Sequence, residues 1–475
     1  MVKFEKVKSN LTMLKSIRLT LEAFMRIPYD IEGFPLGKGP MVMLVLFLIS
    51  CLFIFAPAKE KGENLEFWIF ANTHYEEYQA RVPIFEVLHP EINIQLINYG
   101  GTMHDKLLTA LLSDFGAPDV VEVEITSIGR FLKGDIDEVG FVDLRPRLES
   151  EGWMDKLVVS RFTPWSYRGK IFGIPHDLHP VVLLYRDDLF KAAGVEMTDI
   201  ETWDDFIAAG KKATRDLDSD GKIDQYAIVL DNKTESDYFN LLLQRGGGFF
   251  DAEGNVVIDS DIAIETLAFF TSLFNEHKIA TPVYGTWHGD PSNFAAMQDG
   301  KILSILAPDW YVGILKSQVP QMTGKWKAIG MPAWEVGDRR TTTRGGTMIG
   351  ITKQCENPDL AWELLKFAYF DKAGLINRYE TTRIIPPLKA AWDAPIYKEP
   401  DAYLGGQPLG ELFIELAPDL PPRYQNPYWS EAADLLNDAI FNAVTEKQTP
   451  RQALTELAER VRSIIAKDQE RWGKM

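Results

Sequence analysis

The chain has 475 residues, 46% of them hydrophobic, and a net charge of −18 at pH 7. A chain of this length folds as more than one domain around large apolar cores. Residues 1–40 hold seven Lys and Arg against four Asp and Glu, so the rest carries about −21. This excess of acid excludes a nucleic-acid partner, because phosphate binding needs clustered positive charge.

Residues 41–58 read MVMLVLFLISCLFIFAPA, eighteen residues without a charge. As a helix rising about 1.5 Å per residue they would reach roughly 27 Å, close to the thickness of a bilayer core. The sequence therefore predicts one N-terminal transmembrane helix that stays uncleaved as an anchor. Residues 1–40, rich in Lys and Arg, would then be a cytoplasmic tail or leader.

Two other fates of this run stay open. Cys51 ends the stretch Leu48-Ile49-Ser50-Cys51, which resembles a lipobox, and it would then be the lipidated first residue. Ala56-Pro57-Ala58 is a small-x-small pattern that a signal peptidase cleaves. All three fates place the remainder of the chain on the extracytoplasmic face of the bacterial cytoplasmic membrane, either anchored or released to the periplasm or cell surface. The only other cysteine is Cys355, so no disulfide framework is expected.

Strand and helix patterns alternate after this run. Strands are predicted over 65–70, 92–97 and 116–121, with helices over 75–89 and 103–112 between them. Strands joined by helices pair in parallel, with helices on both faces of the sheet. The fold class is therefore α/β.

An ordered series of motifs continues almost to the C-terminus. It comprises Gly169–Pro175, Leu183–Gly194, Thr202–Phe206, Phe294–Lys301, Asp309–Tyr311, Gly345–Ile351 and Pro358–Phe367. In this order the motifs resemble the bacterial extracellular solute-binding proteins of family 1, the maltose-binding-protein-like receptors of sugar ABC importers. The resemblance covers about residues 64–470.

This resemblance implies a two-lobed periplasmic-binding-protein-like fold of type II, with discontinuous lobes and a hinge. Lobe 1 would comprise residues 64–176 plus 335–380, and lobe 2 residues 177–334 plus 381–475. It also implies a monomer that captures a carbohydrate, either a mono- or an oligosaccharide, in the cleft between the lobes. Hinge closure would then deliver the ligand to ABC permease subunits, with no chemistry done on it.

Sugars present hydroxyls that need polar partners and C–H faces that stack on aromatic rings, so both kinds of residue are expected in the cleft. The resemblance gives Trp310, in a predicted loop, the role of the stacking residue and Asp177 that of a ligand-binding acid. Gly345 and Gly346 lack a Cβ and would let backbone approach the ligand. The other predicted ligand residues lie in loops at strand ends: Asn72, Thr73, His74, Glu124, Asp309 and Tyr311. Weaker candidates on a predicted helix are Tyr238, Asn240 and Gln244, whereas Trp203 is predicted to be structural, behind the helix cap Thr202.

Asp216, Asp218 and Asp220 stand at the first, third and fifth positions of a pattern typical of calcium loops, with Gly221 sixth. Lys222, through its backbone carbonyl, and Asp224 would complete the ligands. The twelfth position is Ala227, where a bidentate Glu is usual, so the predicted Ca²⁺ site is weak. A plain Asp-rich turn is the alternative, and no other cofactor is predicted.

Enzyme signatures are missing from the sequence. It contains no Gly-x-Ser-x-Gly, no His-Glu-x-x-His and no Cys/His metal spacing. We therefore predict a binding protein and not an enzyme. The alternative function is a membrane-anchored receptor or sensor for a sugar or another small solute such as a polyamine.

Overall fold

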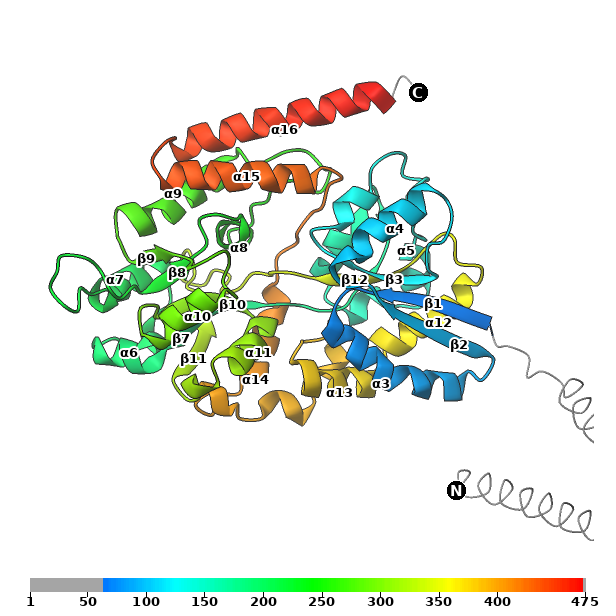
Figure 1. Ribbon diagram of the computed structural model, residues 1–475, viewed down its shortest axis with the longest axis horizontal. Coiled ribbons are helices and arrows are strands. Elements are labelled where there is room, and N and C mark those ends of the chain that lie inside the picture. The colour runs from blue at the N-terminus through cyan, green and yellow to red at the C-terminus, as the bar shows by residue number, and fades with distance from the viewer. Residues whose placement is uncertain (1–62, 473–475) are drawn as a thin grey trace, which may run out of the picture. The chain divides into compact units, whose positions relative to one another are not determined.

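The computed structural model describes residues 63–472, which build two lobes around two main β-sheets (Figure 1). None of the helices in this part of the chain is long and apolar enough to cross a bilayer. The predicted transmembrane helix at 41–58 and Cys51 lie outside the described residues.

The sheet of lobe 1 has the strand order β2-β1-β3-β12-β6. β1 (Glu63–Ile69) pairs in parallel with β2 (Ile92–Asn98) and with β3 (Val120–Glu124). This confirms the predicted parallel pairing, although β3 begins later than the predicted strand. β12 (Thr347–Ile351) returns from far along the chain and runs antiparallel to both β3 and β6 (Ile174–Pro175).

Helices cover both faces of this sheet, because consecutive residues of a strand point to opposite sides. Phe67 packs on the α3 side (Asn72–Leu88), with its ring centroid 4.9 Å from that of Tyr78. Trp68 lies in the core on the α4 side (Met103–Leu112) with Leu107. Three further helices complete lobe 1: α5 (Arg145–Ser150), α12 (Pro358–Tyr369) and α13 (Lys372–Thr382).

In lobe 2, the central strand β7 (Val181–Arg186) lies antiparallel between β10 (Ser304–Pro308) and β11 (Trp326–Gly330). All six residues of β7 are buried, which is typical of a strand covered on both faces. A second pair, β8 (Ile228–Leu230) and β9 (Ala280–Pro282), is parallel.

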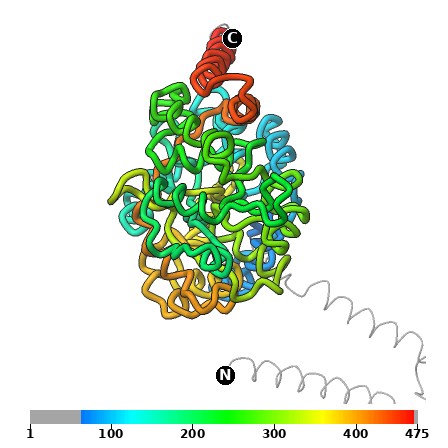
Figure 2. Tube along the Cα trace, turned by 90° about the vertical axis from the view of Figure 1, so that its left-hand side faces the viewer, coloured from blue at the N-terminus to red at the C-terminus, as the bar shows by residue number. Residues whose placement is uncertain are grey.

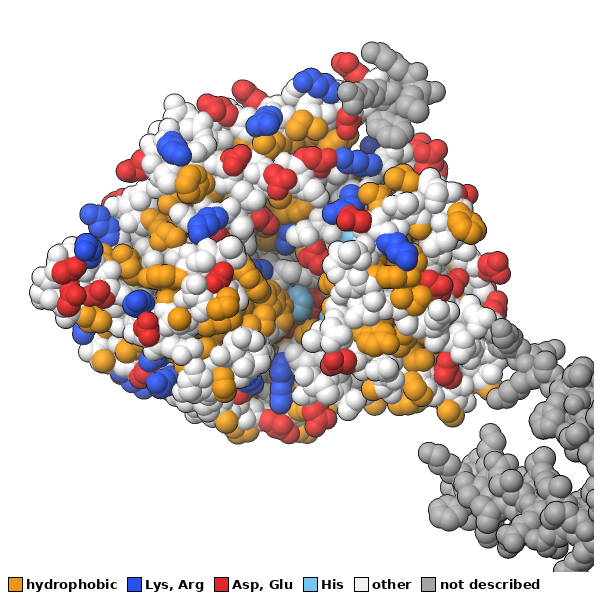
Figure 3. Space-filling model, viewed as in Figure 1, with side chains coloured by type: hydrophobic (Ala, Val, Ile, Leu, Met, Phe, Trp, Pro, Cys, Tyr) orange, Lys and Arg blue, Asp and Glu red, His pale blue; other side chains and the backbone are white. Residues whose placement is uncertain are grey.

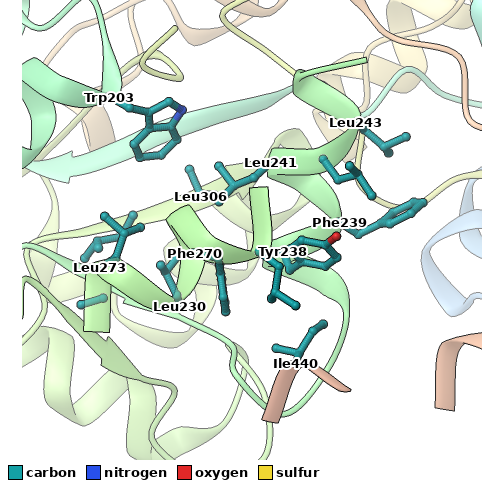
Figure 4. Packing of buried hydrophobic residues seen from close by; sticks show 14 of the residues in the cluster. Trp203, Leu230, Tyr238, Phe239, Leu241, Leu243, Phe270, Leu273, Leu306 and Ile440 are labelled. Carbon is teal, nitrogen blue, oxygen red and sulfur yellow. The ribbon is translucent and has the colours of Figure 1, made fainter. Parts of the chain in front are cut away.

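The helices of lobe 2 enclose an aromatic core. Figure 4 shows Tyr238 of α8 beside Phe270 and Ile440, and α15 and α16 lie side by side (Figure 1, Figure 2). Trp203 is buried behind Thr202, whose side chain forms a capping box with Asp205, as predicted. The helices are α6 (Asp187–Ala192), α7 (Trp203–Ala213), α8 (Ser236–Gln244), α9 (Asp261–Asn275), α10 (Pro291–Gln298), α11 (Asp309–Gln318), α14 (Leu409–Leu416), α15 (Trp429–Val444) and α16 (Pro450–Trp472).

The chain passes between the two sheets through segments 176–180 and 331–346, and Pro180 and Thr343 form an antiparallel bridge between these segments. Segment 383–408 leads from α13 to α14, and 417–428 leads on to α15 along lobe 1. In this last segment Arg423 N donates to Thr163 Oγ1 of lobe 1 at 2.9 Å. Paired segments of this kind are where a hinge can bend.

Candidate ligand-binding cleft

The surface is hollowed between the two lobes (Figure 3). The carboxyl ends of β1 and β3 face this hollow from lobe 1 (Figure 1). The N-termini of α8 and α11 approach it from lobe 2. Ligands of open α/β sheets bind at the carboxyl ends of strands, so this hollow is the candidate cleft.

Trp310 is half-buried and lies at the edge of lobe 2 nearest the hinge. It stands in the first turn of α11, so the predicted loop is wrong. Pro308 precedes the helix as its N-cap residue, and Asp309 supplies the acidic first turn that the helix dipole favours. The indole Nε1 donates to the carbonyl of Arg344 at 3.3 Å, and the ring stands edge-on to Tyr311, at 79°. An indole held from its edge in this way can keep a face for a sugar ring.

Asp177 is completely buried in the first crossing segment. Its Oδ1 accepts from Arg161 Nη2 at 2.9 Å, and its Oδ2 accepts from the backbone N–H of Thr347 at 2.9 Å. Burial would raise the pKa of Asp177, but His179, His176 and Arg161 outweigh it and hold the pKa well below its usual range. Asp177 therefore ties together the hinge segments in this conformation and presents no surface to a ligand, contrary to the sequence prediction.

His179 joins this carboxylate to lobe 2. Its Nε2 lies 3.1 Å from Asp177 Oδ2, and its Nδ1 lies 2.6 Å from Asp309 Oδ1. Burial alone would lower the pKa of His179, but the two carboxylates raise it to about 9. The imidazolium cation is therefore held between the hinge and the start of α11. Its backbone φ of 49° lies in the left-handed region, a strain of the kind found at switch positions.

Asp309 and Tyr311, both predicted as ligand residues, are buried. Asp309 Oδ2 accepts from the backbone N–H of Ile385 at 3.1 Å. The hydroxyl of Tyr311 donates to the carbonyl of His288 at 2.9 Å. Both residues position α11, and neither faces the hollow.

The hinge network continues into lobe 1 through His74, which is buried in the first turn of α3. Its Nδ1 lies 3.0 Å from Glu122 Oε2. Burial would lower the pKa of His74, but Glu122 raises it above its ordinary value. The His74 ring stacks on that of His176 at 4.2 Å and 24°. His176 Nδ1 lies 3.4 Å from Asp177 Oδ2, and burial, with Arg378 and His74, lowers the pKa of His176 well below its usual range.

His74, Glu122 and His176 bring ligand atoms within 4.8 Å of one another. Lone pairs of imidazole lie in the ring plane, and these two planes are nearly parallel. The lone pairs of the two rings therefore point side by side and do not converge on one ion. We interpret His74 and Glu122 as a buried ion pair on which the ring of His176 stacks.

The glycine pair after Arg344 packs tightly. Gly345 has a φ of 86°, and a Cβ there would stand 3.4 Å from both His179 and Trp310. At Gly346, with a φ of 153°, a Cβ would stand 2.8 Å from Arg161 Nη2. The missing side chains therefore admit the hinge guanidinium and the indole, whereas the predicted approach to a ligand stays a prediction.

Arg344 is a cleft residue that sequence reasoning missed, although its place beside the glycine pair was a usable signal. It is half-buried, and its guanidinium contacts Asp237 Oδ1 at 3.3 Å and Ser236 Oγ at 3.2 Å. His288 Nε2 lies 2.6 Å from the other oxygen of Asp237. Burial would raise the pKa of Asp237, but His288 and Arg344 lower it. Arg344 thus links the return crossing to α8 of lobe 2.

From lobe 1, Asn72 and Thr73 are exposed, and Glu124 is half-buried at the end of β3. Asn72 and Thr73 stand in the first turn of α3, where Asn72 Nδ2 donates to Glu76 Oε1 at 2.7 Å. The helix therefore starts three residues before the predicted helix, and the predicted loop is wrong. Burial raises the pKa of Glu124, which Thr126 partly offsets by hydrogen bonding.

Arg423 is a second residue that was not predicted from the sequence, because no motif marks it. Burial lowers its pKa to about 10, although the charges of Glu235 and Glu124 oppose this. Its guanidinium lies 4.9 Å from the ring centroid of Trp429. A buried cation thus lies near acids of both lobes.

The weaker candidates Tyr238, Asn240 and Gln244 are all buried. Gln244 Oε1 accepts from Trp203 Nε1 at 3.2 Å, and the hydroxyl of Tyr238 donates to a backbone carbonyl. These side chains belong to the core of lobe 2. Helix residues of these types are core residues more often than ligand contacts.

The predicted calcium loop lies on the surface of lobe 2. Asp216, Asp218 and Asp224 bring carboxylate oxygens within 4.8 Å of one another. Asp220 pairs with Lys222 at 3.1 Å, and backbone N–H groups of the loop donate to Asp216. Calcium binding here stays a prediction from the sequence.

Comparison with known proteins defines the class. Residues 71–374 match the model of the bacterial extracellular solute-binding protein family. The chain belongs to this family.

Two relatives are arabinooligosaccharide-binding proteins. The one from Bacillus subtilis (strain 168) is 29% identical over 427 residues, which is 88% of this chain and 96% of the relative. The one from Halalkalibacterium halodurans is 30% identical over 412 residues, 85% and 89% of the two chains. Among solved structures, the sugar-binding protein MalE from Xanthomonas citri has the same fold, with a TM-score of 0.72 at 20% identity over 87% of this chain and 100% of its own.

Proposed function

We propose that this protein is the substrate-binding component of an ABC importer for an oligosaccharide. It captures the ligand in the cleft between the lobes and releases it unchanged to the permease. The observation that carries this proposal is the match to two arabinooligosaccharide-binding proteins along nearly the whole chain.

The arrangement of the cleft supports the proposal. Trp310 offers an aromatic platform from lobe 2, while Asn72, Thr73 and Glu124 offer polar groups from lobe 1. Arg344 and His179 tie α8 and α11 to the crossing segments. A ligand that touches both lobes favours the closed form, because only that form makes both sets of contacts.

A thermal-shift screen tests the ligand class. It should include monosaccharides, arabino-oligosaccharides, galacto-oligosaccharides and the polyamine spermidine. We expect stabilisation by an oligosaccharide, since a ligand that binds only the folded state raises the melting temperature. Stabilisation by spermidine alone would contradict the proposal and favour the sensor for another solute.

We further propose that residues 41–58 hold the protein on the outer face of the cytoplasmic membrane, beside its permease subunits. The length of this run and the basic residues before it support this. Mass spectrometry of the mature protein distinguishes an intact N-terminus from lipidated Cys51 or cleavage after Ala58. Co-purification with a permease tests the partnership, and recovery in a cytoplasmic soluble fraction would contradict both statements.

A further inference from the structure

A second large groove lies between the lobes, under α16. It has a volume of about 1000 Å³. Lobe 1 contributes loop 133–138 and the turn at Tyr167-Arg168, lobe 2 contributes loop 253–256 and α16, and segment 426–428 contributes one wall. A groove of this volume is large enough for several sugar rings.

Two tyrosines from different parts of the chain converge in it. Tyr167 and Tyr428 are both half-buried. Both side chains line the groove, and burial raises the pKa of Tyr428. Arg168 lies 5.1 Å from the ring centroid of Tyr167, and Lys133 lies 5.2 Å from that of Tyr428. The two aromatic rings are therefore held in place by neighbouring cations.

Charge in the groove is largely compensated. Lys133 Nζ pairs with Glu431 at 2.5 Å, and Arg462 forms two contacts of 2.8 Å with Asp259. Acidic side chains in the wall include Glu138 and Glu253. Lys133 and Arg462 are paired with acids, and the wall carries further carboxylates. A groove of this kind suits an uncharged polar ligand better than an anion.

A tight hairpin turn forms part of this wall. Arg168 has a φ of 46° in the tight turn between β4 (Ser166–Tyr167) and β5 (Lys170–Ile171). Gly169 also has a positive φ, of 83°, as a two-residue hairpin turn of this type requires. The turn places Arg168 beside Tyr167 in the groove wall.

The groove adjoins the cleft. Gln425, next to its wall residue Asn426, donates through Nε2 to the carbonyl of Ile125 at 3.0 Å. Ile125 directly follows Glu124, which ends β3. The wall of the groove is thus bonded to the chain directly after the end of β3, the strand whose carboxyl end faces the cleft.

We propose that the groove under α16 binds the outer rings of an oligosaccharide whose inner rings lie in the cleft. This role of the groove rests on the proposed function and adds to it a preference for longer oligosaccharides. Tyr428 and Tyr167 are the stacking platforms. Both lobes line the groove, so a long ligand holds the lobes together at a second place.

The test is calorimetric titration of the full-length protein with arabino-oligosaccharides from disaccharide to octasaccharide. In the wild type we expect affinity to rise with length. Tyr428→Ala and Tyr167→Ala should weaken binding of the longest ligand at least tenfold and leave disaccharide binding within twofold. Tyr428→Phe keeps the ring and should restore most of the affinity. Tyr226→Ala, at another half-buried tyrosine of lobe 2 outside the groove, is the matched control and should behave as wild type.

Equal losses for short and long ligands would overturn the groove proposal, since Tyr428 would then shape the cleft itself. The groove proposal would also be overturned if the two alanine variants bound ligands of every length as wild type does. A wild type whose affinity does not depend on ligand length would overturn it as well. In each of these cases carbohydrate binding itself stands. A wild-type protein that binds no member of the series would overturn the carbohydrate function and the groove proposal together.

Discussion

Asp309 Oδ1 of lobe 2 lies 2.6 Å from Nδ1 of His179 in the hinge. The other nitrogen of this imidazole lies 3.1 Å from Asp177, which Arg161 also contacts. One histidine thus connects the first crossing segment with the start of α11, the helix that presents Trp310. The start of α11 is therefore tied to the hinge through the imidazole of His179.

Trp310→Ala should weaken carbohydrate binding at least tenfold, which corresponds to about 1.4 kcal/mol. The variant removes the ring face on which we propose that the sugar stacks, while α11 keeps its other anchors. Trp153→Ala is a matched control, because Trp153 is also half-buried but packs on Phe370 in lobe 1. Calorimetry on both variants checks this, and an unchanged dissociation constant for Trp310→Ala would contradict the cleft assignment.

The ion pairs of His179 should make stability depend on pH. The folded protein holds the proton up to about pH 9, whereas the unfolded chain releases it near 6.5. The protonated His179 therefore adds about 3 kcal/mol to the free energy of unfolding. This contribution is complete below pH 6.5 and is lost as the pH rises toward 9. Urea unfolding of wild type and His179→Gln checks this. The difference between the two proteins should be large at pH 6 and small at pH 9.5, and a difference independent of pH would contradict the assignment.

Asp177→Asn should destabilise the protein by about 3 to 5 kcal/mol, because it leaves the Arg161 guanidinium buried without its carboxylate. Asp137→Asn is the control, since the carboxylate of Asp137 is exposed and its pair with Lys170 lies on the surface. Denaturant unfolding should show little change for the control. Near-equal stability of the two variants would mean that the hinge ion pair is not needed.

Gly346→Ala should also destabilise the protein, because its Cβ would stand 2.8 Å from Arg161 at a φ that side chains rarely adopt. Gly313→Ala, on α11 with open space around it, should instead stabilise the protein by up to about 1 kcal/mol. Melting temperatures of the two variants should therefore move in opposite directions. A stabilising Gly346→Ala would contradict the packing described for the hinge.

Much of lobe 1 was predictable because its period-two strands and capped helices are local patterns. The strand at Ile92–Asn98 and the helix at Met103–Leu112 appear where the pattern indicates. The start of α3 was misplaced because a polar triplet, Asn72 to His74, reads as a loop. In the structure His74 instead pairs with Glu122, forty-eight residues away. Such a partner has no local signature.

The same limit applies to the candidate site. The ligand role of Trp310, taken from its motif, stays a prediction, and Asp177 reads like a cleft acid until Arg161 and Thr347 are brought against it. Arg161 and Arg423 follow no recognisable pattern, because only the tertiary fold gives them partners. Motifs therefore indicated the region of the cleft better than the role of each side chain.

Calorimetric titration of the wild-type protein with arabino-oligosaccharides, followed by chromatography of the recovered ligand, decides whether the protein is a carbohydrate receptor. We predict saturable binding at one site per chain and a ligand recovered unchanged. Absence of heat with every carbohydrate, or recovery of shortened sugars, would contradict a carbohydrate receptor that performs no chemistry.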